Sequence, residues 1–143
     1  MIVSESNNEE RIFSFLESND IYFVPNLSSR IELKVYAKKI ANNSFNIFLT
    51  NENGKDIGHA AVYINSGSTS FLTSFCIDKS VYGKGVSSIL LRKVFIACLK
   101  NKSALLELEV DYTNQKAIHF YKKNGFVVFK ENEKSQLMSK KLD

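Results

Sequence analysis

The stretch that most constrains this chain is Val81 to Ser88, which reads Val-Tyr-Gly-Lys-Gly-Val-Ser-Ser. An apolar run ending at Ile77 precedes it, and an apolar stretch from Ile89 to Leu99 follows it. Gly83 and Gly85 have no Cβ atoms, so the backbone can adopt positive φ and approach a ligand closely. The first N–H groups of the following helix lie at the positive end of its dipole. The segment therefore predicts a strand, a tight turn and a helix N-terminus, which either binds an anion such as phosphate or is a tight turn alone.

A second motif, Asn-Gln-Lys-Ala-Ile-His-Phe-Tyr-Lys-Lys-Asn-Gly-Phe, runs from Asn114 to Phe126. The two motifs, in their order and separation, resemble those of the GNAT superfamily of acyl-CoA-dependent N-acetyltransferases. The glycine segment is similar to that family's pyrophosphate loop, and the later motif is similar to its second cofactor motif. Tyr82 stands where arginine or glutamine is usual and Ser87 where glycine or alanine is usual. Because serine adds a hydroxyl donor and little bulk, we expect Ser87 to alter the affinity and not to abolish binding.

The resemblance implies an α/β (α+β) fold, in which helices flank a twisted, mixed and mostly antiparallel sheet with a central parallel strand pair. Hydrophobic periodicity and turn residues predict the elements. The expected helices are 7–18, 28 or 29 to 43, 89–99 and 114–124, and the expected strands are 45–50, 56–64, 70–77, 105–110, 126–130 and 136–142. Ser29 and Glu32 have capping-box spacing for the second helix. The family usually opens with a strand, for which only Ile2-Val3 is available.

The length of 143 residues predicts one domain, 1–143. The net charge of +4 suits an anionic cofactor, but the lysines are scattered, so nucleic acid is not expected as the main partner. The N-terminus has no signal-peptide pattern and no stretch has membrane-spanning length, so we expect a cytoplasmic protein without a membrane partner. The two cysteines, Cys76 and Cys98, are expected to be reduced thiols. No metal is expected, because histidines and cysteines lack ligand spacing.

The cofactor residues follow from the resemblance, which implies acetyl-CoA as the co-substrate. Its pyrophosphate would bind the glycine segment, at Gly83, Lys84, Gly85, Val86, Ser87 and Ser88. The pantetheine arm would pair like an extra strand with the backbone near Cys76 and Ile77. Asn114 would bond this arm, and it is also a suitable helix N-cap; the two roles are compatible.

Two residues are candidates for proton transfer. The resemblance implies that Tyr121 protonates the departing CoA thiolate; alternatively, it is a core residue on an amphipathic helix. Glu109 lies in Leu-Glu-Val-x-x-x-Asn, similar to enzymes that acetylate the N-terminal alanine of a ribosomal protein, where the matching glutamate is proposed as general base. Alternatively, Glu109 is a solvated strand carboxylate. His59 is a further candidate base, although its apolar surroundings are more typical of a structural histidine.

The expected activity is direct acetyl transfer to a primary amine: a small amine, an amino sugar or a peptide N-terminus. Arg30, Tyr36, Tyr63 and Asn65 are candidates for the acceptor pocket. The oligomeric state is left open between monomer and homodimer. Two other functions remain: a regulatory module that binds acyl-CoA without turnover, and a toxin-like acetyltransferase that acts on aminoacyl-tRNA.

Overall fold

The fold is a twisted sheet with two helices on each face. The structure, a computed structural model, describes residues 1–64 and 67–143. In these residues it contains seven strands: β1 (Ile2–Glu5), β2 (Phe45–Thr50), β3 (Asp56–Ile64), β4 (Thr69–Ile77), β5 (Leu105–Asp111), β6 (Val127–Glu131) and β7 (Ser135–Lys141). Their order is β1-β2-β3-β4-β5-β7-β6, and of the pairs between them only β4–β5 is parallel. This arrangement confirms the predicted fold class.

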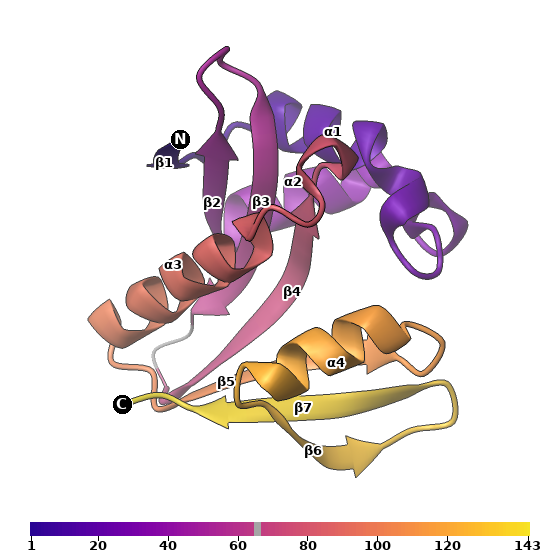
Figure 1. Ribbon diagram of the computed structural model, residues 1–143, viewed down its shortest axis with the longest axis vertical. Helices are drawn as coiled ribbons and strands as arrows, with labels where there is room; N and C mark the ends of the chain where they lie inside the picture. Colours follow the sequence, from indigo (N-terminus) through magenta and orange to yellow (C-terminus); the bar gives the residue numbers. More distant parts are fainter. Residues whose placement is uncertain (65–66) are drawn as a thin grey trace.

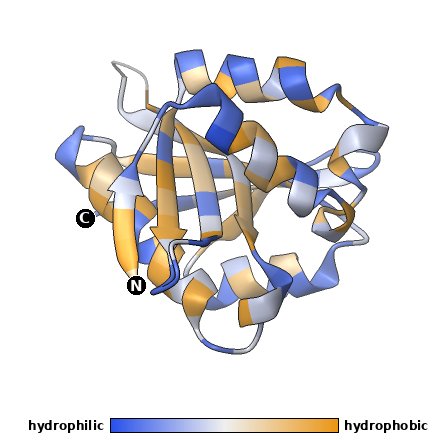
Figure 2. Ribbon diagram, turned by 90° about the horizontal axis from the view of Figure 1, so that it is seen from above, coloured by the Kyte–Doolittle hydropathy of each residue, from blue (hydrophilic) through white to orange (hydrophobic). Residues whose placement is uncertain are grey.

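Each α-helix packs its apolar side against one face of the sheet. The α-helices are α1 (Glu9–Ser18), α2 (Leu33–Asn43), α3 (Val86–Lys100) and α4 (Gln115–Lys123). The helices α1 and α2 pack on one face around Phe48, and α3 and α4 pack on the other around Leu90 and Leu106 (Figure 1). Figure 2 shows hydrophobic residues concentrated in the strands, while the helices carry hydrophilic and hydrophobic residues side by side. No helix of residues 1–64 and 67–143 is both long enough and apolar enough to cross a bilayer.

The parallel pair β4–β5 is short, and this positions the site. Thr69–Leu72 pairs with Leu105–Leu108, and beyond these residues the two strands separate, as Figure 1 shows. The strand β4 also contains a bulge, because Ala61 of β3 is opposite Ser74 whereas Val62 is opposite Leu72. The extra residue is Thr73. Since a bulge bends its strand and increases the local twist, β4 turns away from β5 at this point.

The N-terminal third differs from the expectation in one place. A strand does form at Ile2–Glu5, antiparallel to β2. However, α2 begins at Leu33, so the predicted start at Ser28 or Ser29 and the capping box are wrong. Ser29 lies in a short 3₁₀ helix, where its hydroxyl donates to the carbonyl of Asn26, and Glu32 is the N-cap without a side-chain hydrogen bond. A local hydrogen bond has therefore replaced the cap.

His59 is part of the core between the sheet and α1. Its side chain is fully buried against the rings of Phe48 and Phe15, at centroid distances of 4.8 and 5.9 Å. Its Nε2 lies 2.9 Å from Oδ1 of Asn46. Burial lowers the pKa of His59 from 6.5 to about 3, so the imidazole is neutral at physiological pH.

We predict that His59 makes the protein less stable in mild acid. The unfolded chain takes up a proton on His59 below about pH 6.5, whereas the folded chain does so only near pH 3. Stability is therefore lost as pH falls, by about 2 kcal/mol between pH 7 and pH 5. Urea unfolding at both pH values should show that His59→Gln removes this part of the pH dependence. The control is His119→Gln on the exposed side of α4, which should keep the wild-type slope.

Candidate functional site

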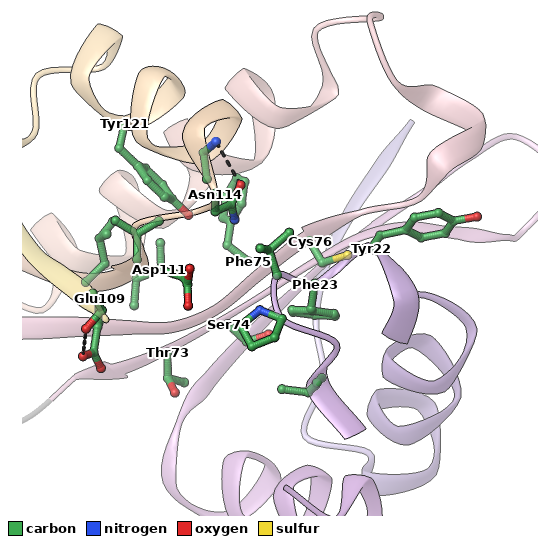
Figure 3. Close-up of a pocket in the computed structure, with 18 of the residues that line it drawn as sticks. Tyr22, Phe23, Thr73, Ser74, Phe75, Cys76, Glu109, Asp111, Asn114 and Tyr121 are labelled. Atoms are coloured by element: carbon green, nitrogen blue, oxygen red, sulfur yellow. Dashed lines mark hydrogen bonds between the residues drawn. The ribbon is translucent and has the colours of Figure 1, made fainter. Parts of the chain in front are cut away.

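A cavity of about 840 Å³ opens where β4 and β5 separate. Its walls come from β4 and β5, from α4, from α2 and the connector that precedes it, from the glycine segment at the start of α3, and from the turn between β6 and β7. Figure 3 shows Tyr121, Asn114, Glu109 and Asp111 on one side of the separated strands, with Tyr22 and Phe23 of the connector on the other. Segments far apart in the sequence thus meet in one space.

The glycine segment has the conformation expected for an anion site. Gly83 and Gly85 have φ values of 77° and 76°. Gly85 is the N-cap of α3, and the first helical hydrogen bond is donated by Ile89 to its carbonyl oxygen. The N–H groups from Val86 to Ser88 therefore precede that bond and are available to a ligand. Of the predicted pyrophosphate residues, Ser87 lines the cavity, while Gly83, Lys84, Gly85, Val86 and Ser88 lie outside its lining.

Tyr82, the unusual residue of this segment, also lines the cavity. Its ring lies 6.1 Å from the ring of Tyr22, and Nζ of Lys116 lies 4.3 Å from its centroid. An aromatic side chain thus holds a lysine of α4 beside the helix N-terminus of α3. This lysine adds positive charge to the rim near the anion site.

The unpaired edge of β4 forms another part of the cavity wall. Within residues 1–64 and 67–143 the strand has no partner on the β5 side after Leu72, and Cys76 and Ile77, which are predicted to pair with the pantetheine arm, line the cavity. The Cys76 side chain is 7% exposed. Burial, together with the charge of Asp78, raises the pKa of Cys76 to about 12. Cys76 therefore remains a thiol at neutral pH.

The helix α4 positions two predicted residues. Asn114 is its N-cap, with Oδ1 accepting from the N–H of Ala117 at 3.2 Å, as predicted; its amide nitrogen donates to no residue of the described chain. Tyr121 is packed edge-on against Phe126 and Phe75, and its hydroxyl points into the cavity (Figure 3). Burial raises the pKa of Tyr121 far above its ordinary value. The hydroxyl is thus protonated at neutral pH and, within the described residues, has no hydrogen-bond partner.

Two carboxylates come from the end of β5. Glu109 lines the cavity and accepts a hydrogen bond of 2.5 Å from Oγ of Ser135, drawn dashed in Figure 3. Glu107, one pleat earlier, does not line the cavity. Asp111 was not predicted, although strand alternation places it on the side of Glu109. The side-chain and backbone hydrogen bonds from Thr113 lower the pKa of Asp111, which is therefore ionised.

The candidates for the acceptor pocket are only partly brought together. Arg30 and Tyr36 line the cavity, Tyr63 does not, and Asn65 lies outside the described residues. His59 does not line the cavity either, so its position gives no support to a role as base. Sequence reasoning missed the connector residues Tyr22, Phe23, Val24 and Pro25 and the strand residues Thr73 and Ser74. The connector has no hydrophobic periodicity that could have indicated them.

Comparison with known proteins places the chain among acetyltransferases. A family model described as "Acetyltransferase (GNAT) family" matches residues 9–126. Ard1 from Thermoplasma volcanium is 18% identical with a TM-score of 0.81, covering 99% of this chain and 97% of its own. The PaiA N-acetyltransferase from Thermoplasma acidophilum, solved in complex with coenzyme A, is 15% identical with a TM-score of 0.79, covering 99% of each chain. At these identities the likeness shows the fold alone. No relative is found among curated protein sequences.

We predict that Gly85→Val weakens the binding of coenzyme A while the fold survives. A Cβ at residue 85 would meet no atom within 4 Å, so the penalty is the strain of valine at φ +76°. Relieving that strain, about 1–3 kcal/mol, displaces the N–H groups of the turn and should raise the Kd roughly tenfold or more. The matched control is Gly54→Val, which has the same open space at φ +80° in the β2–β3 turn. Calorimetry should show weaker binding for Gly85→Val only; equal affinity for both variants would contradict the prediction.

Proposed function

Because the chain belongs to the GNAT family of acetyltransferases, we propose that it transfers an acetyl group from acetyl-CoA directly to a primary amine. The observation that carries this proposal is the meeting of three features in one cavity: an open strand edge, a protonated tyrosine hydroxyl and a strand-end carboxylate. The first suits an extended thioester, and the other two suit the transfer of protons.

For the cofactor, we assign the pyrophosphate to the N-terminus of α3, where Gly83 and Gly85 open the backbone. The pantetheine arm would follow the unpaired edge of β4 past Cys76 and Ile77. Asn114 would donate its free amide N–H to the arm while its oxygen continues to cap α4. This path leads the thioester from the glycine segment towards Tyr121.

The reaction itself requires two proton transfers. The amine nitrogen attacks the carbonyl carbon of the thioester, a new C–N bond forms, and the C–S bond breaks. Tyr121 gives its proton to the departing sulfur, since its buried hydroxyl is protonated at neutral pH. Glu109 accepts the proton that the amine loses, directly or through a water molecule, and Ser135 holds the carboxylate. Placing amine and thioester side by side replaces a bimolecular encounter with a positioned one.

Cys76 is a possible competitor, because its sulfur lies in the same cavity and could in principle carry the acetyl group. A pKa of about 12 leaves almost no thiolate on Cys76 at neutral pH, and the thiolate is the nucleophile. We therefore assign direct transfer and not an acetyl-cysteine intermediate. The broad test is thiol release from acetyl-CoA with a panel of small amines, amino sugars and peptides. Binding of acetyl-CoA without turnover by any of them would favour a regulatory module instead.

We predict that Tyr121→Phe lowers kcat on the order of 10²-fold. Phenylalanine keeps the packing against Phe75 and Phe126 but cannot donate a proton to sulfur. The KM for acetyl-CoA should change little. Steady-state kinetics with a good acceptor test this, and an unchanged kcat would make Tyr121 a core residue only.

We predict that Glu109→Gln lowers kcat/KM at neutral pH and that raising the pH partly restores it. An aliphatic amine is mostly protonated near pH 7, so a base is needed until free amine becomes available. The control is Glu107→Gln, on the same strand but outside the cavity lining, which should behave like the wild type. Identical pH–rate profiles for the wild type and Glu109→Gln would show that the amine loses its proton elsewhere.

A further inference from the structure

The connector side of the cavity contains buried hydroxyl groups that acetyl transfer does not use. Tyr36 donates to the carbonyl of Thr73 at 3.1 Å, and its hydroxyl lies 3.0 Å from Oγ1 of Thr73. Ser74 is 5% exposed and lines the cavity, yet its hydroxyl has no partner among the described residues. We call Tyr36, Thr73 and Ser74 the hydroxyl cluster. An unpartnered buried hydroxyl is destabilising unless a ligand or water completes its hydrogen bonds.

Charged side chains of both signs line the cavity near this cluster. Arg30, Lys134 and, at the rim, Lys116 supply positive charge, and Glu109 and Asp111 supply negative charge. Arg30 and Lys134 contribute, after the hydrogen bonds from Thr113, to the lowered pKa of Asp111. However, the two salt bridges of the described chain, Arg11–Asp56 and Lys55–Asp78, both lie elsewhere. Among the described residues, the charged side chains that line the cavity therefore form no salt bridge with one another.

Arg30 connects the charges with the hydroxyl cluster. Burial raises the pKa of Tyr36, and the hydrogen bond with Thr73, the positive charge of Arg30 and the neighbouring Ser74 hydroxyl act in the opposite direction. Arg30 therefore acts electrostatically on both Tyr36 and Asp111, and all three residues line the cavity. A guanidinium group presents several N–H donors in a plane, which suits the two oxygens of a carboxylate or the oxygens of a phosphate.

We propose that the acceptor amine also carries an anionic oxygen group, carboxylate or phosphate, which Arg30 and the hydroxyl of Ser74 bind. The inference rests on the acetyl transfer proposed above. The ammonium end of such a molecule is attracted to Glu109 and Asp111 at the end of β5, where the thioester would arrive. Its anionic end completes the hydrogen bonds of the cluster.

The apolar residues of the lining indicate which kind of side chain this acceptor carries. Apolar side chains of the connector and of β4 lie in the same wall, namely Phe23, Pro25, Leu27, Ile31 and Phe71. They suit an apolar group of the size of a leucine or phenylalanine side chain. The acceptor class is therefore a zwitterionic amine with an apolar side chain, as in an α-amino acid or its phosphonate analogue.

Product binding tests the anion site without depending on turnover. Calorimetry in the presence of CoA would compare N-acetylphenylalanine, its phosphonate analogue and the neutral N-acetylphenylalaninamide. One of the two anions should bind on the order of 10- to 100-fold more tightly than the amide, as expected for charge-assisted hydrogen bonds. The tighter anion identifies the group as carboxylate or phosphate. Equal affinity of all three, or no binding of any, would overturn the proposal.

Variants show whether the named residues cause this preference. Arg30→Gln, at an exposed position, should reduce the preference to near one, and Ser74→Ala should reduce it several-fold. The control is Arg92→Gln on the exposed side of α3, which removes the same charge far from the lining and should keep the preference. An unchanged preference in Arg30→Gln would overturn the assignment.

Thiol release separates this inference from the proposed function. With phenylalanine and phenylalaninamide as acceptors, the wild type should prefer the anionic acceptor through KM and not kcat. If product binding depends on Arg30 but no amine releases thiol, acetyl transfer is wrong and the anion site stands. If both amines react equally well, acetyl transfer stands and the anion site is wrong.

Discussion

The structure depends on how far β4 and β5 remain paired. Their parallel ladder ends at Leu72 and Leu108. The cavity lies between the two strands beyond this last pair. A backbone edge left open inside a protein has unsatisfied N–H and C=O groups, which are costly unless something completes them. The bulge at Thr73 turns β4 away, and the hydroxyl of Tyr36 accordingly donates to the carbonyl of that extra residue. The separation of β4 from β5 is thus stabilised by the bulge and by the hydrogen bond from Tyr36.

In the proposed reaction, one face of the sheet binds the cofactor and the other face binds the acceptor. The helices α3 and α4, on one face, present the turn at Gly85, the cap at Asn114 and the hydroxyl of Tyr121. The connector and α2, on the other face, present Arg30 and Tyr36. The cofactor would therefore be held mainly by one core and the acceptor by the other. Apart from Tyr22, whose ring lies 6.1 Å from that of Tyr82, side chains on the connector can then differ without disturbing the turn that would hold the cofactor.

Sequence patterns predicted most of the regular elements well. The strands β2 and β3 were expected at their observed bounds, since a polar turn with Gly54 separates two apolar runs. Asn114 was expected as a cap because local hydrogen bonding determines a cap. The bulge at Thr73 could not be predicted, because it depends on pairing with β3 and on Tyr36, both distant in sequence. The predicted start of α2 was wrong for a related reason. Ser28 donates to the carboxylate of Asp20 and Ser29 to the carbonyl of Asn26, so neither serine caps the helix.

The short β4–β5 ladder has a consequence for how the chain folds. The strands β1 to β4 follow one another both in sequence and in the sheet, while β5, β6 and β7 form a second group. Only the pairs from Thr69–Leu105 to Leu72–Leu108 join the two groups within the sheet, and forming them closes the long loop that contains α3. Because loop closure costs entropy before such contacts become favourable, we expect the β4–β5 pairs to form late in folding. The backbone amides of these pairs should also exchange hydrogen earlier than those of β2 and β3. The cavity would then be the last part of the molecule to take shape.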